Sequence, residues 1–478
     1  MSTDTLTQPA IESATINSIP TDAGLIDTGL IDGLREACGG AVHVPGDAGY
    51  DAARQAWQAI VDQRPAAVVY PATADEVVAV VRLTAAAGVA IVPQGTGHNA
   101  NPLGSLDDAV LLRTSAMRSV EVDPVRRVAR VGSGALWLDV VEAVAPYGLM
   151  ALHGSSPDVG VTGYSLGGGI GWYARALGMQ TNNLTAVELV LPDGRFVRAS
   201  AEENDELFWA VRGGGGNFGV VTTLEMQLHP IETAYAGWLV WDWHEAHRVL
   251  TRWAQWAVDA PDEVTTSLRI MQLPPIEAVP PPLRGRQIVA IDGAVLGDDE
   301  TAQRILAPLR ELQPEMDTFA RMPAAALVRL HGDPEGPTPA VSATTMLGSL
   351  PAEGIDAFIN AAGPDSGSTM MVAELRQLGG ALARSDAANG ALSHLDGQFI
   401  AFTVGVPMGG LEAEKALTAE AEALIGALAP WRNGRSYSNF AEDAVDAASF
   451  YEPAAYERLR QIRQSVNPDG RVRANHRI

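Results

Sequence analysis

A histidine inside a glycine-rich turn is the first feature of this sequence that could do chemistry. His98 follows an apolar run and lies in the segment QGTGHN, residues 94–99. Gly95 and Gly97 would let the backbone approach a ligand, and successive backbone amides in such turns form anion-binding concavities. The turn therefore indicates a phosphate-bearing cofactor beside His98. A purely structural turn with an exposed histidine is the alternative.

Two further glycine-rich loops follow in the next 120 residues. One is GSSPDVGVTGYSLGGGIG at residues 154–171, and the other is GGGGNFG at residues 213–219. Glycine has a high conformational entropy cost on folding, so such runs are tolerated mainly where a backbone must come close to a ligand. Three loops of this kind, each bounded by strand or helix signals, suggest one long ligand held along its length.

Two short motifs offer other interpretations of these glycines. Residues 95–100 match the dinucleotide pattern G-x-G-x-x-A, but that motif needs a helix at its third position, and the residues NPLG at 101–104 cannot begin one. Residues 163–167 match G-x-S-x-G, which would make Ser165 the nucleophile of a serine hydrolase. His229, His331 and His394 lie downstream, so chain order allows a triad. The approach at residues 156–163 is not the apolar strand that a nucleophile elbow needs.

Composition limits the classes of partner. The chain has 33 Lys and Arg against 57 Asp and Glu, a formal charge of -24, which disfavours binding to nucleic acid or to anionic membranes. Cys38 is the single cysteine, so internal disulfides and cysteine-cluster metal sites are excluded, and we expect no metal. Neither a signal peptide nor an apolar run of about 18 residues is apparent. We therefore expect a cytoplasmic protein.

The pattern of elements predicts how the first turn is held. A strand at residues 66–70 precedes a capping box at Thr73 and Glu76, a helix over 77–87 and a strand over 89–93, which together form a β-α-β unit ending at His98. A hairpin over residues 186–199 and a helix over 205–212 lead to the third glycine loop.

The composition changes after Pro230, where tryptophans crowd together and a proline-rich loop spans residues 273–283. Beyond that point strands alternate with helices, which predicts a second domain with helices on one face of a sheet. The expected strands cover residues 267–272, 287–295, 370–375 and 398–406, and the expected helices cover residues 301–312, 355–362 and 412–428. A last helix is expected over residues 453–465.

The three glycine loops, the segment YSNF at residues 437–440 and the segment NPD at 467–469 occur in an order that resembles one family. They closely resemble the FAD-linked oxidases of the berberine-bridge-enzyme-like branch, within the vanillyl-alcohol oxidase and p-cresol methylhydroxylase flavoprotein superfamily. The resemblance runs from about Arg64 to the C-terminus. It implies an α+β flavoprotein of two domains, with a p-cresol methylhydroxylase-type FAD-binding domain and an inserted substrate domain built on an antiparallel sheet covered by helices.

The resemblance also implies domain boundaries and a mode of cofactor binding. The FAD-binding domain would comprise residues 36–232 and 431–478, the substrate-binding domain residues 233–430, and residues 1–35 a mobile tail. His98 matches the histidine that carries the 8α-methyl carbon of the flavin, and Ser156 stands where many relatives have a second, cysteine link. FAD linked through His98 only is therefore expected. The other residues expected to contact FAD are Pro93, Gln94, Gly95, Thr96, Gly97, Asn99, Gly104, Gly154, Ser155, Ser156, Val159, Gly160, Gly163, Tyr164, Gly167, Gly168, Asn217, Gly219 and Val220.

The catalytic assignments follow from the same resemblance. Tyr437 is the expected base and Asn439 would position flavin or substrate; Phe440 and Tyr164 depart from the family pattern. A free tyrosine has a pKa near 10, so the surroundings of Tyr437 would have to lower it, and no arginine or lysine can be assigned to that task from sequence.

The substrate and the electron acceptor are less constrained. Gln398, Arg376 and His394 are candidates for the substrate wall, and the resemblance implies that the small Val159 favours reaction with O2. The expected reaction is hydride removal from an alcohol or amine carbon of a small organic molecule, with O2 reduced to H2O2. A dehydrogenase using another acceptor and the serine hydrolase are the alternatives. The oligomeric state is left open.

Overall fold

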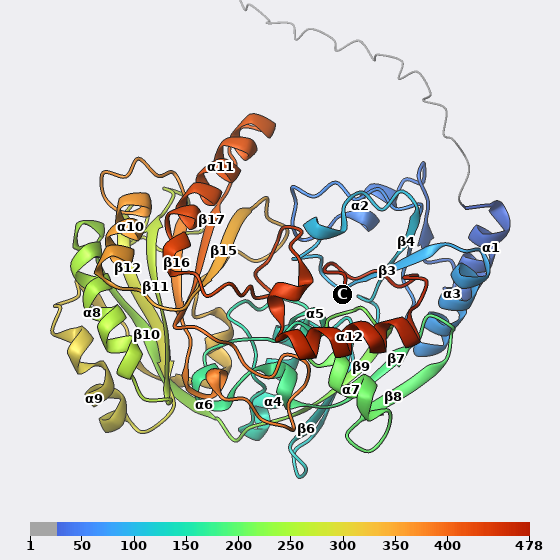
Figure 1. Ribbon diagram of the computed structural model, residues 1–478, viewed down its shortest axis with the longest axis horizontal. Coiled ribbons are helices and arrows are strands. Elements are labelled where there is room, and N and C mark those ends of the chain that lie inside the picture. Colours follow the sequence, from blue (N-terminus) through green and yellow to red (C-terminus); the bar gives the residue numbers. More distant parts are fainter. Residues whose placement is uncertain (1–25) are drawn as a thin grey trace, which may run out of the picture.

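Three β-sheets organise the chain, which a computed structural model describes from residue 26 to residue 478 (Figure 1). The first sheet has the strand order β1 (Val42–His43), β2 (Ala67–Val69), β4 (Ala109–Arg113), β3 (Ala90–Gln94). β2, β4 and β3 are parallel, because helix α3 (Ala74–Ala86) returns the chain between β2 and β3. The predicted β-α-β unit is present, and it ends at the turn that carries His98.

The predicted capping box holds the start of α3. The Thr73 hydroxyl accepts a hydrogen bond from the amide of Glu76 at 3.2 Å, and the Glu76 carboxylate accepts one from the amide of Ala72 at 2.8 Å. The glutamate reaches one residue beyond the usual partner of this motif. The first bond satisfies one of the amides that the first turn of a helix leaves without a partner, and the second fixes the residue before the cap.

The expected mobile tail over residues 1–35 is wrong in its last part. Helix α1 (Thr28–Ala37) begins at an Asp27 cap, whose carboxylate accepts from the amide of Leu30 at 2.7 Å. Leu30 and Leu34 are buried in the apolar core beneath the first sheet, and this burial orders the segment. Residues 1–25 lie outside the described part of the chain.

The second sheet is antiparallel and contains five strands. Their order is β5 (Val120–Asp123), β6 (Val128–Gly132), β9 (Val220–Gln227), β7 (Leu184–Val190), β8 (Phe196–Ser200). Besides α1 and α3, the half of the molecule that contains the first two sheets has the helices α2 (Tyr50–Arg54), α4 (Trp137–Val144), α5 (Val161–Leu166), α6 (Ala174–Leu177) and α7 (Asp205–Val211). The second glycine-rich loop surrounds α5, and the third joins α7 to β9.

The C-terminal segment returns to this half of the molecule. Helix α12 (Pro453–Val466) is followed by a stretch in which Val472 forms a parallel bridge with Ile91 of β3. Arg473 also pairs with Asp108, with Nη1 and Oδ1 2.7 Å apart. The last residues of the chain therefore lie beside the first sheet, as Figure 1 shows.

The third sheet has eight strands, and its neighbouring strands pair antiparallel. The order is β13 (Met316–Asp317), β10 (Thr233–Asp242), β12 (Gln287–Val295), β11 (Val264–Gln272), β16 (Val372–Gln377), β17 (Phe399–Gly405), β15 (Val341–Leu347), and β14 (Ala320–Pro323) also pairs with β10. Four helices cover its outer face: α8 (Ala246–Asp259), α9 (Asp299–Arg310), α10 (Ala352–Ala362) and α11 (Leu411–Ala427) (Figure 1).

The two faces of this sheet pack against different parts of the molecule. Leu268, Leu375 and Phe399 pack in the apolar core under the covering helices. Met346 and Ile400 point the other way, into the core that also contains Leu166 and Tyr437 of the other half. Side chains of a strand alternate between faces, so residues 374, 376, 400 and 402 face the glycine-rich loops. The sheet thereby forms one wall of the space next to these loops.

These features confirm the predicted fold class, a two-domain α+β flavoprotein fold with an antiparallel second sheet covered by helices. The boundaries at residues 36–232 with 431–478 and 233–430 stay a prediction. Among residues 26–478, no helix combines the length and the apolar character needed to cross a bilayer.

Candidate active site

The turn after β3 holds His98 in a fixed orientation. Gly97 has φ +83°, and a Cβ there would lie 2.9 Å from the Cβ of Ala56, so only glycine fits. The His98 ring stacks on Trp57 with centroids 3.9 Å apart, and Thr96 Oγ1 lies 2.7 Å from Nδ1. Nε2 has no hydrogen-bond partner within residues 26–478. One ring nitrogen is therefore held by the protein and the other is free.

Burial keeps the His98 imidazole uncharged. It lowers the pKa of His98 to about 4, although the nearby Asp158 carboxylate acts in the opposite direction. At neutral pH the ring then retains a lone pair, which a nucleophilic or covalent role requires. This is the protonation state that a covalent flavin link needs.

Asp158 connects His98 to the other half of the molecule, a role that sequence reasoning missed. Its Oδ2 accepts from Nε1 of Trp57 and from the amide of Gly336, both at 2.7 Å. Its Oδ1 has no hydrogen-bond partner in the described chain and lies 3.8 Å from Nε2 of His98. The only signal in the sequence was a carboxylate inside the second glycine-rich loop. No motif distinguished it from a surface residue.

The three glycine-rich loops and the C-terminal segment meet around this turn. A Cβ on Gly160 of the second loop would lie 3.7 Å from the Thr96 side chain. The amides of Gly213 and Gly215, in the third loop, donate to the carbonyl of Leu166 at 3.0 and 3.1 Å. Asn99 Nδ2 donates to the carbonyls of Ser438 and Ala441, at 3.0 and 3.1 Å. Segments more than 300 residues apart thus form one site.

The residues of this site fit an FAD molecule. The backbone amides of residues 96–99 donate no hydrogen bond within the described chain, so they are free to bind an anion such as a pyrophosphate. A Cβ at Gly163 would meet no atom within 4 Å, and one at Gly95 only Thr114 Oγ1 at 3.8 Å. The first turn therefore combines free amides and an imidazole nitrogen without a partner with glycines that leave room for a ligand.

The third loop takes part mainly through its backbone. The Asn217 side chain is used by the protein itself: Nδ2 donates to the carbonyls of Gly214 and His476, and Oδ1 accepts from the amide of Ile478. A Cβ at Gly219 would come within 2.6 Å of the Val190 carbonyl, so this glycine packs against β7. Neither side chain is free for the cofactor, and the predicted contacts of this loop stay predictions.

The remaining predicted cofactor residues lie in the first two loops or at their ends. Pro93 belongs to β3 and Gly104 follows a single 3₁₀ turn at Asn101–Leu103. That turn is no α-helix, so residues 95–100 do not open the helix that a nicotinamide dinucleotide motif needs. Gly154 and Gly168 contact Tyr164 and Tyr437, respectively, and Ser156 is buried. Val159 is half-buried, and its carbonyl accepts from the amide of Trp137 at 3.0 Å.

The serine hydrolase alternative is not supported. Ser165 lies inside α5 and is fully buried, whereas a nucleophile elbow presents its serine at a strand-to-helix turn. Its Oγ has no hydrogen-bond partner among residues 26–478. His331, a possible base from the sequence, is instead bound to Asp292 in the third sheet. The two groups that a hydrolase needs are not brought together.

Tyr437 reaches the second glycine-rich loop, but its ionisation differs from the prediction. Its Oη accepts from the amide of Gly169 at 2.7 Å and from Asn439 Nδ2 at 3.3 Å, and Asn439 Nδ2 also donates to the carbonyl of Tyr164 at 3.0 Å. Burial raises the pKa of Tyr437 well above its usual value, while the Gly169 amide and the charge of Arg376 act against this rise. The expected net lowering is wrong, because desolvation outweighs both.

Arg376 is the one predicted wall residue that the structure places beside Tyr437. Its guanidinium carbon lies 4.9 Å from the centroid of Phe440, whose ring makes an edge contact with Tyr437 at 5.4 Å. Phe402 of β17 also packs on Phe440, with centroids 5.1 Å apart. An arginine and two phenylalanines therefore line the wall facing the loops.

Glu442 is a second residue that sequence reasoning missed. It follows Phe440 by two positions, and its carboxylate accepts from Gln58 Nε2 at 3.1 Å. Burial raises the pKa of Glu442 to about 7, although hydrogen bonds from Ser342 and Gln58 lower it in part. A carboxyl group with such a pKa beside a cofactor site can exchange protons at neutral pH.

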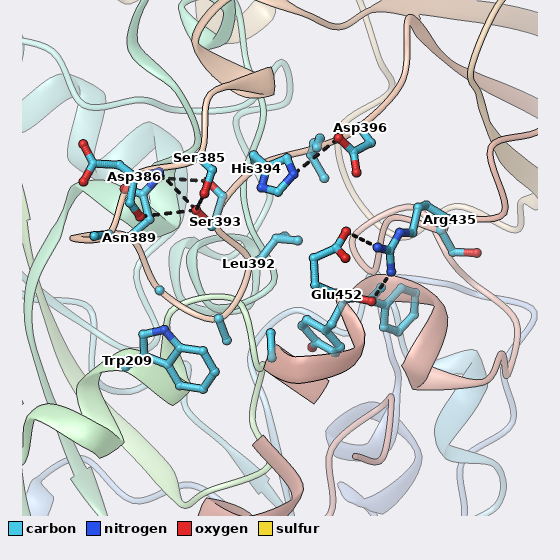
Figure 2. Close-up of a pocket in the computed structure, with 18 of the residues that line it drawn as sticks. Trp209, Ser385, Asp386, Asn389, Leu392, Ser393, His394, Asp396, Arg435 and Glu452 are labelled. Carbon is cyan, nitrogen blue, oxygen red and sulfur yellow. Dashed lines mark hydrogen bonds and ion pairs between the residues drawn. The ribbon is translucent and has the colours of Figure 1, made fainter. Parts of the chain in front are cut away.

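The other two wall candidates lie elsewhere. Gln398 precedes β17, and its backbone is bonded to Leu347 and Leu378. His394 points into a separate cavity of about 240 Å³, together with Asp396 and Glu452 (Figure 2). Neither Tyr437 nor His98 lines that cavity. The structure thus supports Arg376 among the three candidates and brings neither Gln398 nor His394 into contact with Tyr437.

Comparisons with known proteins agree with this geometry. The FAD binding domain family matches residues 65–200. The chain is 36% identical over 203 residues to (R)-6-hydroxynicotine oxidase of Paenarthrobacter nicotinovorans, covering 42% of this chain and 44% of that protein. The crystal structure of 6-hydroxy-D-nicotine oxidase from Arthrobacter nicotinovorans superposes with a TM-score of 0.80 and 26% identity, covering 90% of this chain and 96% of the other.

The FAD binding domain and the fold shared with these flavoproteins agree with the vanillyl-alcohol oxidase and p-cresol methylhydroxylase superfamily that the motifs indicate. The berberine-bridge-enzyme-like protein 1 of Physcomitrella patens has the same fold, with a TM-score of 0.81, 21% identity and coverage of 93% of this chain and 98% of that one. The resemblance inferred from the motifs is therefore confirmed. In sequence, the chain aligns with about half the length of the curated relatives it matches.

Proposed function

We propose that this flavoprotein is an FAD-dependent oxidase that takes a hydride from an amine or alcohol carbon of a small organic molecule and passes the electrons to O2. The observation that carries the proposal is that an uncharged His98, three glycine-rich loops and the segment of Tyr437 are brought together in one region of the fold. The names of the relatives, which are FAD-linked oxidases and oxidoreductases, support the same class.

His98 would hold the cofactor through a covalent bond. The reactive lone pair would be on Nε2, in the tautomer whose Nδ1 carries the proton and donates it to the Thr96 hydroxyl 2.7 Å away. Ser156 offers a hydroxyl where a second link would need a thiolate, and the one cysteine, Cys38, is buried under the first sheet. A single link through His98 follows. When bound, FAD supplies a two-electron acceptor for the substrate hydride.

Tyr437 would orient the substrate as a hydrogen-bond donor. Its oxygen already accepts from Gly169 and Asn439, so its own proton is left to point toward a substrate atom. Because the raised pKa keeps this phenol protonated at neutral pH, Tyr437 is not the proton acceptor there. An uncharged amine needs none, since hydride loss from its carbon leaves an iminium cation. An alcohol does need one, and Glu442 has the suitable pKa.

The size of the Val159 side chain bears on the electron acceptor. Val159 lies in the second loop, is half-buried and leaves more room than leucine or isoleucine would. A small residue at this point allows O2 to approach, which supports an oxidase over a dehydrogenase.

The decisive experiment uses the purified full-length protein. We expect a yellow protein whose colour stays with the acid-precipitated chain and whose mass exceeds that of the polypeptide by one FAD. Aerobic incubation with a panel of amines and alcohols should then release H2O2 for at least one member. A colourless protein that takes up no FAD would refute the proposal. Reduction by a substrate without H2O2 formation in air would identify a dehydrogenase.

A further inference from the structure

The inner face of the third sheet carries an arginine with an unused donor. Arg376 Nε donates to Oε1 of Glu374 at 2.5 Å, and Nη2 lies 3.1 Å from Nε2 of His331. Nη1 has no acceptor within residues 26–478, and it is not among the buried atoms without a partner. With 17% of its side chain exposed, Arg376 therefore presents one edge of its guanidinium to the space beside the loops.

A buried network holds this guanidinium in place. Glu374 and Asp292 are both almost completely buried, and His331 lies between them, 2.8 Å from Asp292 Oδ2 and 3.5 Å from Glu374 Oε2. Asp292 Oδ2 also accepts from Nη2 of Arg269 at 2.6 Å. Although burial alone would raise the pKa of Glu374, the charges of Arg376 and His331 hold it well below its usual range.

This network is unlike an ordinary ion pair at the surface. Protein donors already occupy the oxygens of both carboxylates, so neither carboxylate is free to turn toward a ligand. Arg376 cannot swing away either, because its Nε and Nη2 both donate to the Glu374 carboxylate, at 2.5 and 3.5 Å. Ordering of a flexible side chain, which usually costs binding free energy, is thus complete before a ligand arrives. The Nη1 edge of the guanidinium is therefore already oriented for binding.

The surroundings of this edge define the ligand. Ile400 pairs with Arg376 in the ladder between β16 and β17, and Phe402 follows it on the same face. Phe440 lies under the guanidinium and against Tyr437. The donors of a guanidinium match the oxygens of a carboxylate, and such charge-assisted bonds are about twice as strong as neutral ones. An anionic oxygen beside an apolar wall is the complementary ligand.

We propose that Arg376 binds a carboxylate of the substrate, so that the active site takes small organic acids with an aromatic or alkyl body. The carboxylate would lie at Nη1, and the body would lie along the half-buried rings of Phe440 and Phe402. This inference rests on the proposed function, because it names the substrate class of the same site. It adds a specificity-determining residue that no resemblance supplied.

Binding of simple probes tests the inference without turnover. The holoenzyme is titrated with benzoate, phenylacetate and benzamide, and binding is followed by the change in flavin absorbance and by calorimetry. Benzamide has nearly the shape of benzoate and no charge. The variants are Arg376→Met, which removes the donors, and Arg376→Lys, which keeps the charge. Arg384→Met is the matched control, because Arg384 lies on the surface of the same half and pairs with Asp262.

Loss of one charge-assisted contact should raise the Kd of benzoate about tenfold or more in Arg376→Met. Arg376→Lys should lie between this variant and the wild type, Arg384→Met should match the wild type, and the Kd of benzamide should stay the same in all four. Equal affinity for benzoate and benzamide, or unchanged benzoate binding in both Arg376 variants, would overturn the inference. So would the absence of any carboxylate binding at millimolar concentration.

Failure of the carboxylate site can be distinguished from failure of the proposed oxidase function. The flavin that stays with each denatured variant reports cofactor attachment, and the melting temperature reports folding. If both carboxylates fail to bind while the protein keeps its flavin and forms H2O2 with another substrate, the oxidase stands and the substrate class falls. If the wild type holds no flavin, calorimetry with benzoate still reports whether Arg376 binds the anion.

Discussion

The carboxylate of Asp158 lies 3.8 Å from Nε2 of His98, while its other oxygen holds Trp57 and Gly336. One side chain thus joins the histidine turn to a loop of the other half and sets the charge beside the reactive nitrogen. Because Asp158 comes from the second glycine-rich loop, the position of His98 depends on three segments at once.

Replacing His98 with alanine should abolish covalent attachment of FAD and leave a dissociable complex. The variant removes the partner-free Nε2 of the glycine-rich turn, while the loops themselves are unchanged. The measurement is the flavin that remains with the chain after acid precipitation, beside the flavin bound before it. His476→Ala is a control, because His476 is also buried and donates no group to this turn. Flavin that stays with denatured His98→Ala would contradict the assignment.

The rate at which FAD attaches to the apoprotein should not change through titration of His98 between pH 5 and pH 8. With a pKa of about 4 in the fold, His98 is uncharged across this window and its reactivity is lost only as pH falls toward 4. An exposed histidine would instead lose half its reactivity near pH 6.5. Asp158→Asn keeps acceptors for Trp57 and Gly336, removes the charge that favours the imidazolium and should move the fall to lower pH. A midpoint near 6.5 would show that His98 is not buried.

Tyr437→Phe should slow flavin reduction by substrate while flavin content is kept. The variant loses the hydroxyl that orients the substrate and leaves the Gly169 amide without its acceptor, which costs about 1 to 3 kcal/mol of stability. Stopped-flow absorbance under anaerobic conditions measures the reduction rate. Tyr173→Phe is the matched control, since Tyr173 is equally buried but its hydroxyl makes only a 3.5 Å contact with Ala324. Equal reduction rates in both variants would remove Tyr437 from the mechanism.

Val159→Ile and Val159→Leu should slow reoxidation of the reduced enzyme by O2 and leave reduction by substrate nearly unchanged. Each adds a methylene group at a half-buried position beside the cofactor loops. The test mixes anaerobically reduced enzyme with aerated buffer and follows the return of flavin absorbance. If the reoxidation rate is the same for valine, isoleucine and leucine, the size of this side chain does not control access of oxygen.

Glu442→Gln should stabilise the protein above pH 7 and have little effect below pH 5. The pKa of Glu442 is raised to about 7 in the fold, so the folded state binds a proton that the unfolded state has lost between about pH 4.5 and pH 7. The stability that this proton provides is therefore present at low pH and lost as pH rises through 7. The gain for the glutamine variant at pH 8 should be about 1 to 2 kcal/mol, since the residue is only half-buried.

The measurement for this prediction is the melting temperature of the holoenzyme between pH 5 and pH 8. Asp443→Asn is the control, because Asp443 is the exposed neighbour and bonds to Asn101. A pH profile of stability that is the same in Glu442→Gln and in the wild type would show that Glu442 titrates at an ordinary pKa.

Local patterns in the sequence determined most of the elements and the cofactor loops. The capping residues Thr73 and Glu76, the glycines around His98 and the alternating segments after Pro230 act over a few neighbouring residues, so their structure could be predicted. The superfamily followed from the order of the loops. The end of the presumed tail was misjudged because Leu30 and Leu34 are ordered by a core built from distant strands.

Only the tertiary structure decided the chemistry of the site. The low pKa of His98, the raised pKa values of Tyr437 and Glu442 and the free edge of Arg376 all arise from desolvation and from charges contributed by distant segments. Arg376 and Glu374 are two residues apart, but the His331 and Asp292 that complete their network lie on other elements. Residue type and spacing name the candidate groups, whereas burial and long-range partners set their charge, and those depend on the complete fold.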